Sequence, residues 1–152
     1  MIVKECMTTK VITIDKEKEI IDAIRLMVEN NISGLIVVEN QKVVGVISES
    51  DIVEALKSPF PEILVTPNVS ISILMLIKKG IESLRHAKKV GKLKVKDLMT
   101  KRVFCVKPED TIEEAARIMS EKDVKRLPVV DEEGKLIGII SRSDILKALM
   151  KE

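Results

Sequence analysis

The chain has 152 residues, a formal net charge of +2, an apolar fraction of 45% and a charged fraction of 33%. This composition is typical of a globular protein and not of a disordered one. Aromatic residues make up only 1% of the chain, so the stacking platforms of single-stranded nucleic-acid binders are almost absent. The near balance of charge also argues against the whole chain acting as an electrostatic DNA binder.

The scarcity of metal-binding side chains and the shortness of the apolar runs narrow the possible classes of protein further. Cys6 and Cys105 form no CxxC pair and His86 is the only histidine, whereas a zinc site needs about four ligands. We therefore expect no metal site, and two isolated thiols are typical of a reducing cytoplasm. The longest apolar run, Ile73–Ile77, is far shorter than the roughly twenty residues of a membrane span, and no signal peptide is recognisable. The sequence predicts a soluble cytoplasmic protein.

An internal repeat determines the predicted organisation. Val3–Thr8 returns as Val95–Thr100, and Gly45–Asp51 returns as Gly138–Asp144. One gap, at Gly134, keeps the copies aligned, with about four positions in ten identical over about 55 residues. We predict one repeat at residues 1–57, a linker at 58–93 and a second repeat at 94–152.

The first repeat predicts a strand, a helix, a hairpin and a second helix. The apolar run at 11–14 is typical of a buried strand, and Ile20, Ala23, Ile24 and Met27 form the apolar stripe of the helix. A tight hairpin is expected through Asn40 and Gln41, between strands at 35–39 and 43–48. The last helix is expected at about 50–57.

The linker differs from both repeats. Prolines between residues 58 and 67 predict an extended connection. A helical pattern follows over about 70–89, and its second half is strongly basic. That helix either exposes a solvated face while its other side packs on the protein, or contacts an acidic partner or nucleic acid. His86 lies in this stretch with no acidic or nucleophilic residue nearby, so we do not assign it a catalytic role.

The second repeat follows the same order as the first. A strand is expected at 103–106, and Thr111 with Glu114 predicts a capping-box start for the next helix. Asp131–Gly134 is expected to connect the hairpin, with Gly134 supplying a positive φ, and the last helix runs over about 143–150. Each repeat is therefore β-α-β-β-α, an α/β (α+β) unit, and we expect the two to pack together.

The motif Gly-h-h-Ser-x-x-Asp, where h is apolar, is the most informative candidate site. It places Ser48 and Asp51 in one repeat and Ser141 and Asp144 in the other, where a strand runs into a helix. At that position a hydroxyl and free N–H groups can bind phosphate, and a carboxylate can accept hydrogen bonds from ribose hydroxyls. The same residues can instead form a helix cap, and the motif alone does not separate the two interpretations.

Together, this motif, the Met-Thr pairs before the first strands, and Arg126–Val130 resemble the CBS (cystathionine-β-synthase) domain family. The resemblance covers both repeats and implies a tandem pair, or Bateman module, with a pseudo-twofold axis and clefts that take AMP, ADP, ATP or S-adenosylmethionine. It implies that Asp51 and Asp144 bind ribose hydroxyls and that Ser48 and Ser141 approach phosphate or ribose. It also implies that Lys125 and Arg126 contact the ligand, with a homodimer as the expected assembly.

The two repeats are not equivalent at this predicted site. Where the second has Lys125 and Arg126, the first has Ser33 and Gly34, which carry no charge. Arg126 is either a surface side chain or a phosphate ligand, since its planar guanidinium can bond two oxygens at once. We expect one site suited to a phosphorylated ligand, and the other empty or taking a less anionic adenosyl compound.

The predicted function is that of a non-catalytic regulatory module. It would bind an adenosine-containing ligand, require no cofactor or metal, and act on an unidentified protein target. No catalytic residue is assigned, because no general base lies near a nucleophile and no P-loop, HExxH or Ser-His-Asp order occurs. The alternative is a nucleic-acid-associated regulator that contacts the phosphate backbone through the basic linker helix.

Overall fold

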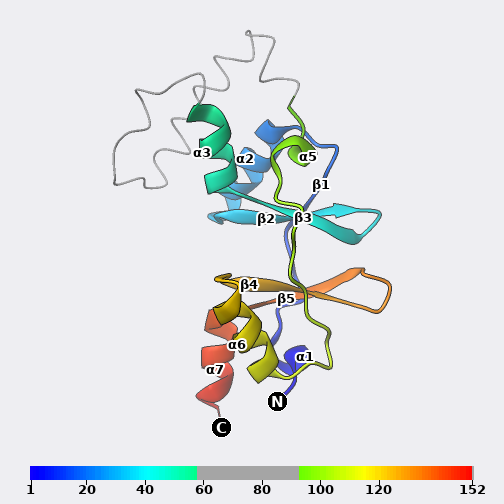
Figure 1. Ribbon diagram of the computed structural model, residues 1–152, viewed down its shortest axis with the longest axis vertical. Coiled ribbons are helices and arrows are strands. Elements are labelled where there is room, and N and C mark those ends of the chain that lie inside the picture. Colours follow the sequence, from blue (N-terminus) through cyan, green and yellow to red (C-terminus); the bar gives the residue numbers. More distant parts are fainter. Residues whose placement is uncertain (58–92, 152) are drawn as a thin grey trace. The chain divides into compact units, whose positions relative to one another are not determined.

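The computed structural model describes residues 1–57 and 93–151 (Figure 1). The helix expected at 70–89, the basic stretch and His86 lie outside the described residues. The described part of the chain is a mixture of helices and two small sheets, in agreement with the predicted fold class. No helix within it has the length and hydropathy needed to cross a membrane.

The chain divides into two compact units that we name after their long helices. The α6–α7 unit comprises Met1–Ile12, Glu39–Val43 and Val103–Glu152. The α2–α3 unit comprises Thr13–Val38 and the described residues of Val44–Arg102. Each unit therefore takes most of one repeat together with the opening segment of the other.

The α2–α3 unit is built on a three-stranded sheet in the order β1-β2-β3. Strand β1 (Thr13–Asp15) pairs in parallel with β2 (Gly34–Glu39), and helix α2 (Ile20–Asn30) connects them. The predicted turn to β3 (Lys42–Ser48) is confirmed: Asn40 and Gln41 both have positive φ, at 50° and 69°. Helices α3 (Glu49–Lys57) and α5 (Val95–Leu98) complete the unit.

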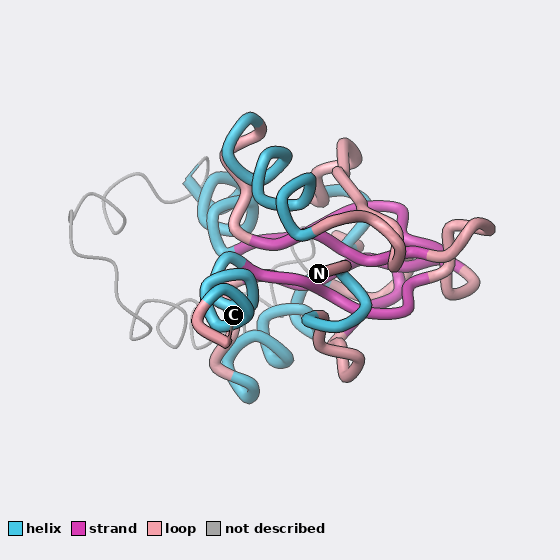
Figure 2. The backbone as a smooth tube through the Cα atoms, turned by 90° about the horizontal axis from the view of Figure 1, so that it is seen from below, coloured by secondary structure: helices cyan, strands magenta, loops and turns pink. Residues whose placement is uncertain are grey.

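The α6–α7 unit has a two-stranded sheet, in which β4 (Arg126–Val130) pairs antiparallel with β5 (Leu136–Ser141). Gly134 has a φ of 83° in the connection, as the longer turn predicts. The helices of the unit are α1 (Val3–Cys6), α6 (Ile112–Glu121) and α7 (Arg142–Leu149). The loops of both hairpins project beyond the helices (Figure 2).

The strand expected at 103–106 is reduced to a single bridge, in which Val106 pairs in parallel with Val129. Val106 N–H donates to the Pro128 carbonyl at 3.0 Å, and Val130 N–H donates to the Val106 carbonyl at 3.0 Å. The next hydrogen bonds of a parallel ladder would need N–H donors at Pro128 and Pro108, and proline has none. In the other unit the equivalent of Pro108 is Lys16, which donates to the Val38 carbonyl at 3.1 Å, so a strand forms there.

The repeated opening segments dock in the same way in both units. Val3 N–H donates to the Asp110 carbonyl, and Val95 N–H donates to the Lys18 carbonyl, each at 2.8 Å. Further along, Thr8 exchanges backbone hydrogen bonds of 2.8 and 2.9 Å with Ile139. Thr100 does the same with Val46, at 2.8 and 3.0 Å. The segment at the start of each repeat thus completes the unit that holds the other repeat's hairpin.

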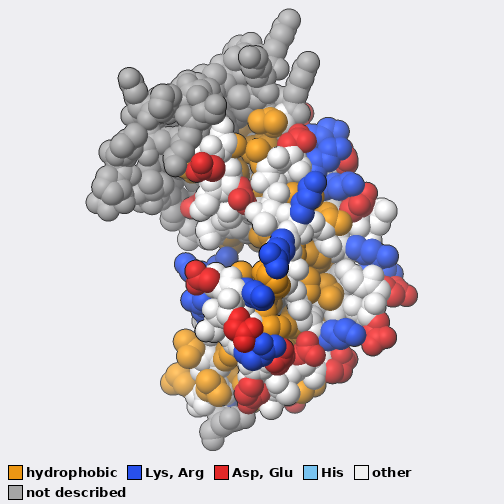
Figure 3. Space-filling model, viewed as in Figure 1, with side chains coloured by type: hydrophobic (Ala, Val, Ile, Leu, Met, Phe, Trp, Pro, Cys, Tyr) orange, Lys and Arg blue, Asp and Glu red, His pale blue; other side chains and the backbone are white. Residues whose placement is uncertain are grey.

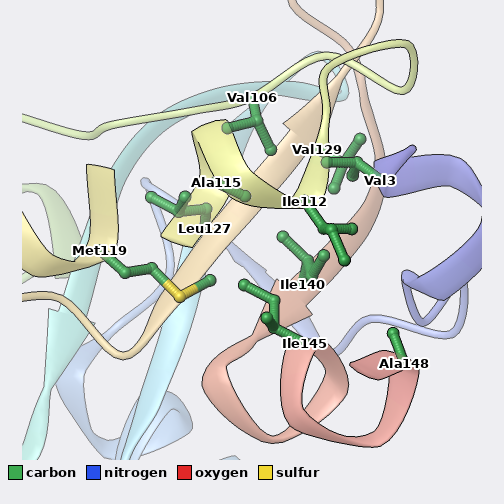
Figure 4. Close-up of a cluster of buried hydrophobic side chains, with 10 residues drawn as sticks. All are labelled: Val3, Val106, Ile112, Ala115, Met119, Leu127, Val129, Ile140, Ile145 and Ala148. Carbon is green, nitrogen blue, oxygen red and sulfur yellow. The ribbon is translucent and has the colours of Figure 1, made fainter. Parts of the chain in front are cut away.

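The opening segments also contribute to the cores. Val3 and Val95 are fully buried, as are Leu35, Ile47 and Ile140. In the α6–α7 unit, Val3 of α1 points into a cluster with Val129, Ile112 and the other residues of Figure 4, which come from α6, β4, β5 and α7 and include Val106 from the segment before α6. Because Val3 closes this cluster, the N-terminal segment is an integral part of the unit and not an appendage.

Candidate functional site

Both Ser-x-x-Asp motifs form complete capping boxes. Ser141 ends β5, and its Oγ accepts from the Asp144 N–H at 3.2 Å, while Asp144 Oδ2 accepts from Ser141 N–H at 2.9 Å and from its hydroxyl at 2.8 Å. Ser48 and Asp51 make the same three bonds, at 3.3, 2.9 and 3.0 Å. These hydrogen bonds confirm that both motifs cap their helices.

Capping leaves part of each carboxylate available. Only Oδ2 takes part in the box, and Asp144 Oδ1 accepts no hydrogen bond from the described residues. At the other site the Thr100 hydroxyl lies 3.4 Å from Asp51 Oδ1, a long hydrogen bond that a ligand could displace. Both aspartates are half-buried, so a polar group from solvent can reach them. Capping and ligand binding are therefore compatible in the same side chain.

Thr100 is a site residue that the sequence reasoning did not assign. It belongs to the Met-Thr pair that recurs before both first strands, and that recurrence was the available signal. The pair's methionine packs over the glycine that begins the candidate motif. A Cβ atom at Gly138 would lie 2.7 Å from Met7 Sδ and 3.0 Å from the Thr8 carbonyl oxygen. At Gly45 the distances to Met99 Sδ and the Thr100 oxygen would be 2.6 and 3.0 Å. The glycine is needed for this close approach.

Lys125 and Arg126 lie beside Ser141 in the same unit. Arg126 is the first residue of β4 and stands directly opposite Ser141 in the antiparallel register. The Lys125 carbonyl accepts from the N–H of Arg142, the first residue of α7, at 3.1 Å. Both basic side chains are exposed, and neither makes an ion pair with a described residue. We call the group Lys125, Arg126, Ser141 and Asp144 the Asp144 site.

The equivalent group in the α2–α3 unit is Ser33, Gly34, Ser48 and Asp51, which we call the Asp51 site. Its backbone geometry matches, because the Ser33 carbonyl accepts from the N–H of Glu49 at 3.0 Å. Its charge does not match, since Ser33 and Gly34 replace Lys125 and Arg126. The six predicted residues thus fall into two separate groups. Four of them form the Asp144 site, and the other two, Ser48 and Asp51, belong to the Asp51 site.

Reactive side chains are few among the described residues. Burial raises the pKa of the Cys105 thiol, and burial with nearby Glu5 raises the pKa of Cys6, so neither is primed as a thiolate. Within residues 1–57 and 93–151, no three His, Cys, Asp or Glu side chains gather to hold a metal ion. The arrangement can donate and accept hydrogen bonds and bind an anion.

Comparison with known proteins identifies the family. The CBS domain model matches residues 3–58 and 95–151, which is most of the chain. The chain belongs to the CBS domain family. The uncharacterized protein MJ1426 of Methanocaldococcus jannaschii is 40% identical over 155 residues, covering 99% of this chain and 92% of that protein. The CBS domain-containing protein CBSX1 of Arabidopsis thaliana chloroplasts is 34% identical over 86% of this chain, which spans 55% of its length.

A solved CBS-pair structure carries a ligand. It is that of CBSX2, a protein of Arabidopsis thaliana, in complex with AMP. It superposes with a TM-score of 0.72 at 31% identity and covers 99% of this chain and 97% of that one. Relatives of this chain that contain the CBS pair therefore include one that binds an adenosine nucleotide.

Proposed function

We propose that the chain is a non-catalytic regulatory module that binds an adenosine-containing ligand through the Asp51 and Asp144 sites. The observation that carries the proposal is the pair of capped aspartates, each with Oδ1 outside its capping box. A carboxylate oxygen of this kind can accept hydrogen bonds from the two hydroxyls of a ribose. The AMP complex of CBSX2 supports the same ligand class.

The ligand at the Asp144 site is proposed to be phosphorylated. Arg126 and Lys125 have no ion-pair partner among the described residues, and the strand register holds Arg126 opposite Ser141. A guanidinium bonds two phosphate oxygens at once, which adds specificity as well as binding energy. AMP, ADP and ATP are therefore the first candidates at this site.

What the sites offer supports a regulatory role. They supply hydrogen-bond partners and charge, and the two described thiols carry raised pKa values. Ligand binding would regulate a target only by differing in affinity between two conformations of the protein. The nucleic-acid alternative rests on the linker helix, which lies outside the described residues, and the relatives reported above lend it no support. We place the protein in the cytoplasm because both of its thiols are free.

We further propose that the chain forms a homodimer through the apolar end of α7. Leu146, Leu149 and Met150 are 63%, 52% and 89% exposed, and the patch is visible in orange beside the C-terminus (Figure 3). Large apolar side chains clustered on one helix end are typical of a protein interface. Leu146→Glu should convert a sedimenting dimer to a monomer, whereas Lys147→Glu should leave it unchanged. A monomeric wild-type chain at micromolar concentration would contradict this proposal.

A thermal-shift screen tests the ligand proposal. A ligand present at about a hundred times its dissociation constant adds about 2.7 kcal/mol, or roughly 5–10 °C for a chain of this size. We expect such a rise with at least one of AMP, ADP, ATP, S-adenosylmethionine and methylthioadenosine. The rise should be lost in Asp144→Ala or Asp51→Ala.

The control for this screen separates capping from binding. Thr111 caps α6, and its Oγ accepts from Glu114 N–H at 3.2 Å. Thr111→Ala therefore removes a cap, at a cost of about 1 kcal/mol, without touching either site. It should lower the Tm and keep the full ligand response. The absence of a rise with any compound would leave the Ser-x-x-Asp motifs as caps alone.

A further inference from the structure

The residue after each capping serine reverses its charge between the two sites. Arg142 follows Ser141 and Glu49 follows Ser48, at the first position of α7 and of α3. The two occupy the same place in the fold, because their N–H groups donate to Lys125 and to Ser33 at 3.1 and 3.0 Å. The asymmetry between the sites is thus larger than the loss of Lys125 and Arg126 alone.

The structure shows which of these charges is neutralised. Arg142 turns toward the end of α6, where its Nη2 lies 3.5 Å from the Met119 carbonyl and 3.6 Å from Asp123 Oδ1. The residue equivalent to Asp123 is Asn31, which has the same left-handed φ of 52° but no charge. The ion pair between Arg142 and Asp123 therefore has no equivalent between Glu49 and Asn31. Glu49 also makes no ion pair with any other described residue.

The unpaired charge at the two sites is opposite in sign. Around Asp144, the acids Asp123 and Asp144 are outnumbered by the bases Lys125, Arg126 and Arg142. At the equivalent positions the Asp51 site has Asn31, Ser33, Gly34, Glu49 and Asp51, which include two acids and no base. A phosphate at the Asp51 site would meet two like charges, which disfavours it, whereas a cation there would be attracted.

We infer that the Asp51 site selects an adenosyl ligand that carries a positive charge, such as a sulfonium, and that Glu49 is the residue that sets this preference. The inference rests on the proposed function, since it assumes that Asp51 binds the ribose. Glu49 is half-buried beside Ser48, so its carboxylate is partly shielded from water while remaining accessible. Each chain then takes two different ligands, an anionic one at the Asp144 site and a cationic one at the Asp51 site.

Two ligands that differ mainly in the charge on sulfur test this preference. S-adenosylmethionine and S-adenosylhomocysteine share one skeleton and differ by a methyl group that makes the sulfur a cationic sulfonium. Isothermal titration of the full chain with each compound should give tighter binding of the sulfonium by about two- to fivefold, the range of a partly exposed ion pair. In Glu49→Gln the two compounds should bind equally, and Glu49→Arg should reverse the order.

A control variant and a titration with AMP complete the experiment. Glu113→Gln makes the same charge change at the first turn of α6 and should leave the ratio of the two affinities at its wild-type value. AMP should bind equally well to the wild type and to Glu49→Gln at the Asp144 site. Equal affinity of the two sulfur compounds for the wild type, with AMP still bound, would overturn the inference and leave the proposed function standing. Failure of all three compounds to bind would overturn both.

Discussion

The α2–α3 and α6–α7 units share their backbone geometry and differ in the side chains that surround it. Both dock an opening segment with hydrogen bonds of nearly equal length, both place methionine over glycine, and both cap a helix with Ser-x-x-Asp. They differ at the positions next to the caps, where one unit has Lys125, Arg126 and Arg142 and the other has Ser33, Gly34 and Glu49. At each helix start, the serine and aspartate of the cap are repeated, whereas the charged residues beside the cap differ between the units.

The largest effect is expected from charging the buried valine of an opening segment. Val3→Asp should destabilise the protein by about 3–5 kcal/mol, because it leaves an unpaired charge inside the core. Val95→Asp should cost a similar amount in the other unit, since both valines are fully buried. Urea denaturation measures both. Lys4→Gln, at an exposed neighbouring position, should change the stability by less than about 0.5 kcal/mol. A small effect of Val3→Asp would show that the N-terminal segment is dispensable.

Overpacking the close approach of methionine to glycine, which occurs in both units, should have the next largest effect. Gly138→Val and Gly45→Val should each cost about 1–3 kcal/mol, since the new side chain meets a methionine sulfur and a carbonyl oxygen. Gly34→Ala provides the contrast: its Cβ would lie 3.4 Å from the Ile47 oxygen, an ordinary contact, so we expect little change. Thermal unfolding of the three variants tests the comparison, which fails if Gly34→Ala is as damaging as the other two.

Two substitutions should remove most of the charge difference between the sites. Gly34→Arg introduces a guanidinium at the position equivalent to Arg126, and a Cβ atom at Gly34 would make only an ordinary contact, 3.4 Å from the Ile47 oxygen. Combined with Glu49→Gln, it should raise the AMP affinity of the Asp51 site by about tenfold, the effect of a charge-assisted hydrogen bond worth about 1.5 kcal/mol. Calorimetry with AMP should then report a second equivalent of ligand. An unchanged stoichiometry would show that charge does not distinguish the sites.

The smallest effect concerns an ion pair present in one unit. Lys94 and Lys96 lie 2.7 and 2.9 Å from Glu17 and lower the pKa of its carboxyl from near 4.5 to about 2. A lowered folded-state pKa stabilises the fold above the unfolded value, and that contribution is lost as the pH falls from 4.5 to 2. Glu17→Gln should therefore lower the Tm slightly at pH 7 and not at pH 2. Salt should shrink the difference, because the side chains are exposed. A Tm difference that persists at pH 2 would assign another role to Glu17.

The sequence predicted the parts of the fold that depend on local chemistry. Asn40 and Gln41, Gly134 and the Thr111 cap all lie where their turn or cap preferences place them. The sequence could not show which unit each opening segment completes, because Val3–Thr8 and Val95–Thr100 present the same buried valine and half-buried methionine. The strand expected at 103–106 was wrong for a reason visible in the sequence, since Pro108 and Pro128 remove the two N–H groups that a longer ladder needs.

The candidate site was predictable only in part, for a similar reason. Ser48 lies beside Asp51, and Ser141 lies beside Asp144, because the Ser-x-x-Asp spacing at a helix start forms a capping box. The placement of Arg126 opposite Ser141 depends on the strand register, and the contact of Thr100 with Asp51 depends on a segment 49 residues away. The spacing of residues within a motif cannot predict either of these contacts.

The measurement that tests the central claim most directly is a calorimetric titration of AMP into the wild-type chain and into Arg126→Ala. The account predicts binding of about one AMP per wild-type chain. It predicts an affinity at least about tenfold lower in Arg126→Ala, because a bidentate guanidinium–phosphate contact is lost. Lys122→Ala, which removes an exposed lysine from the end of α6 and not from the site, should bind AMP as the wild type does. Equal affinity of the wild type and Arg126→Ala, or no binding to either, would contradict the assignment of the Asp144 site.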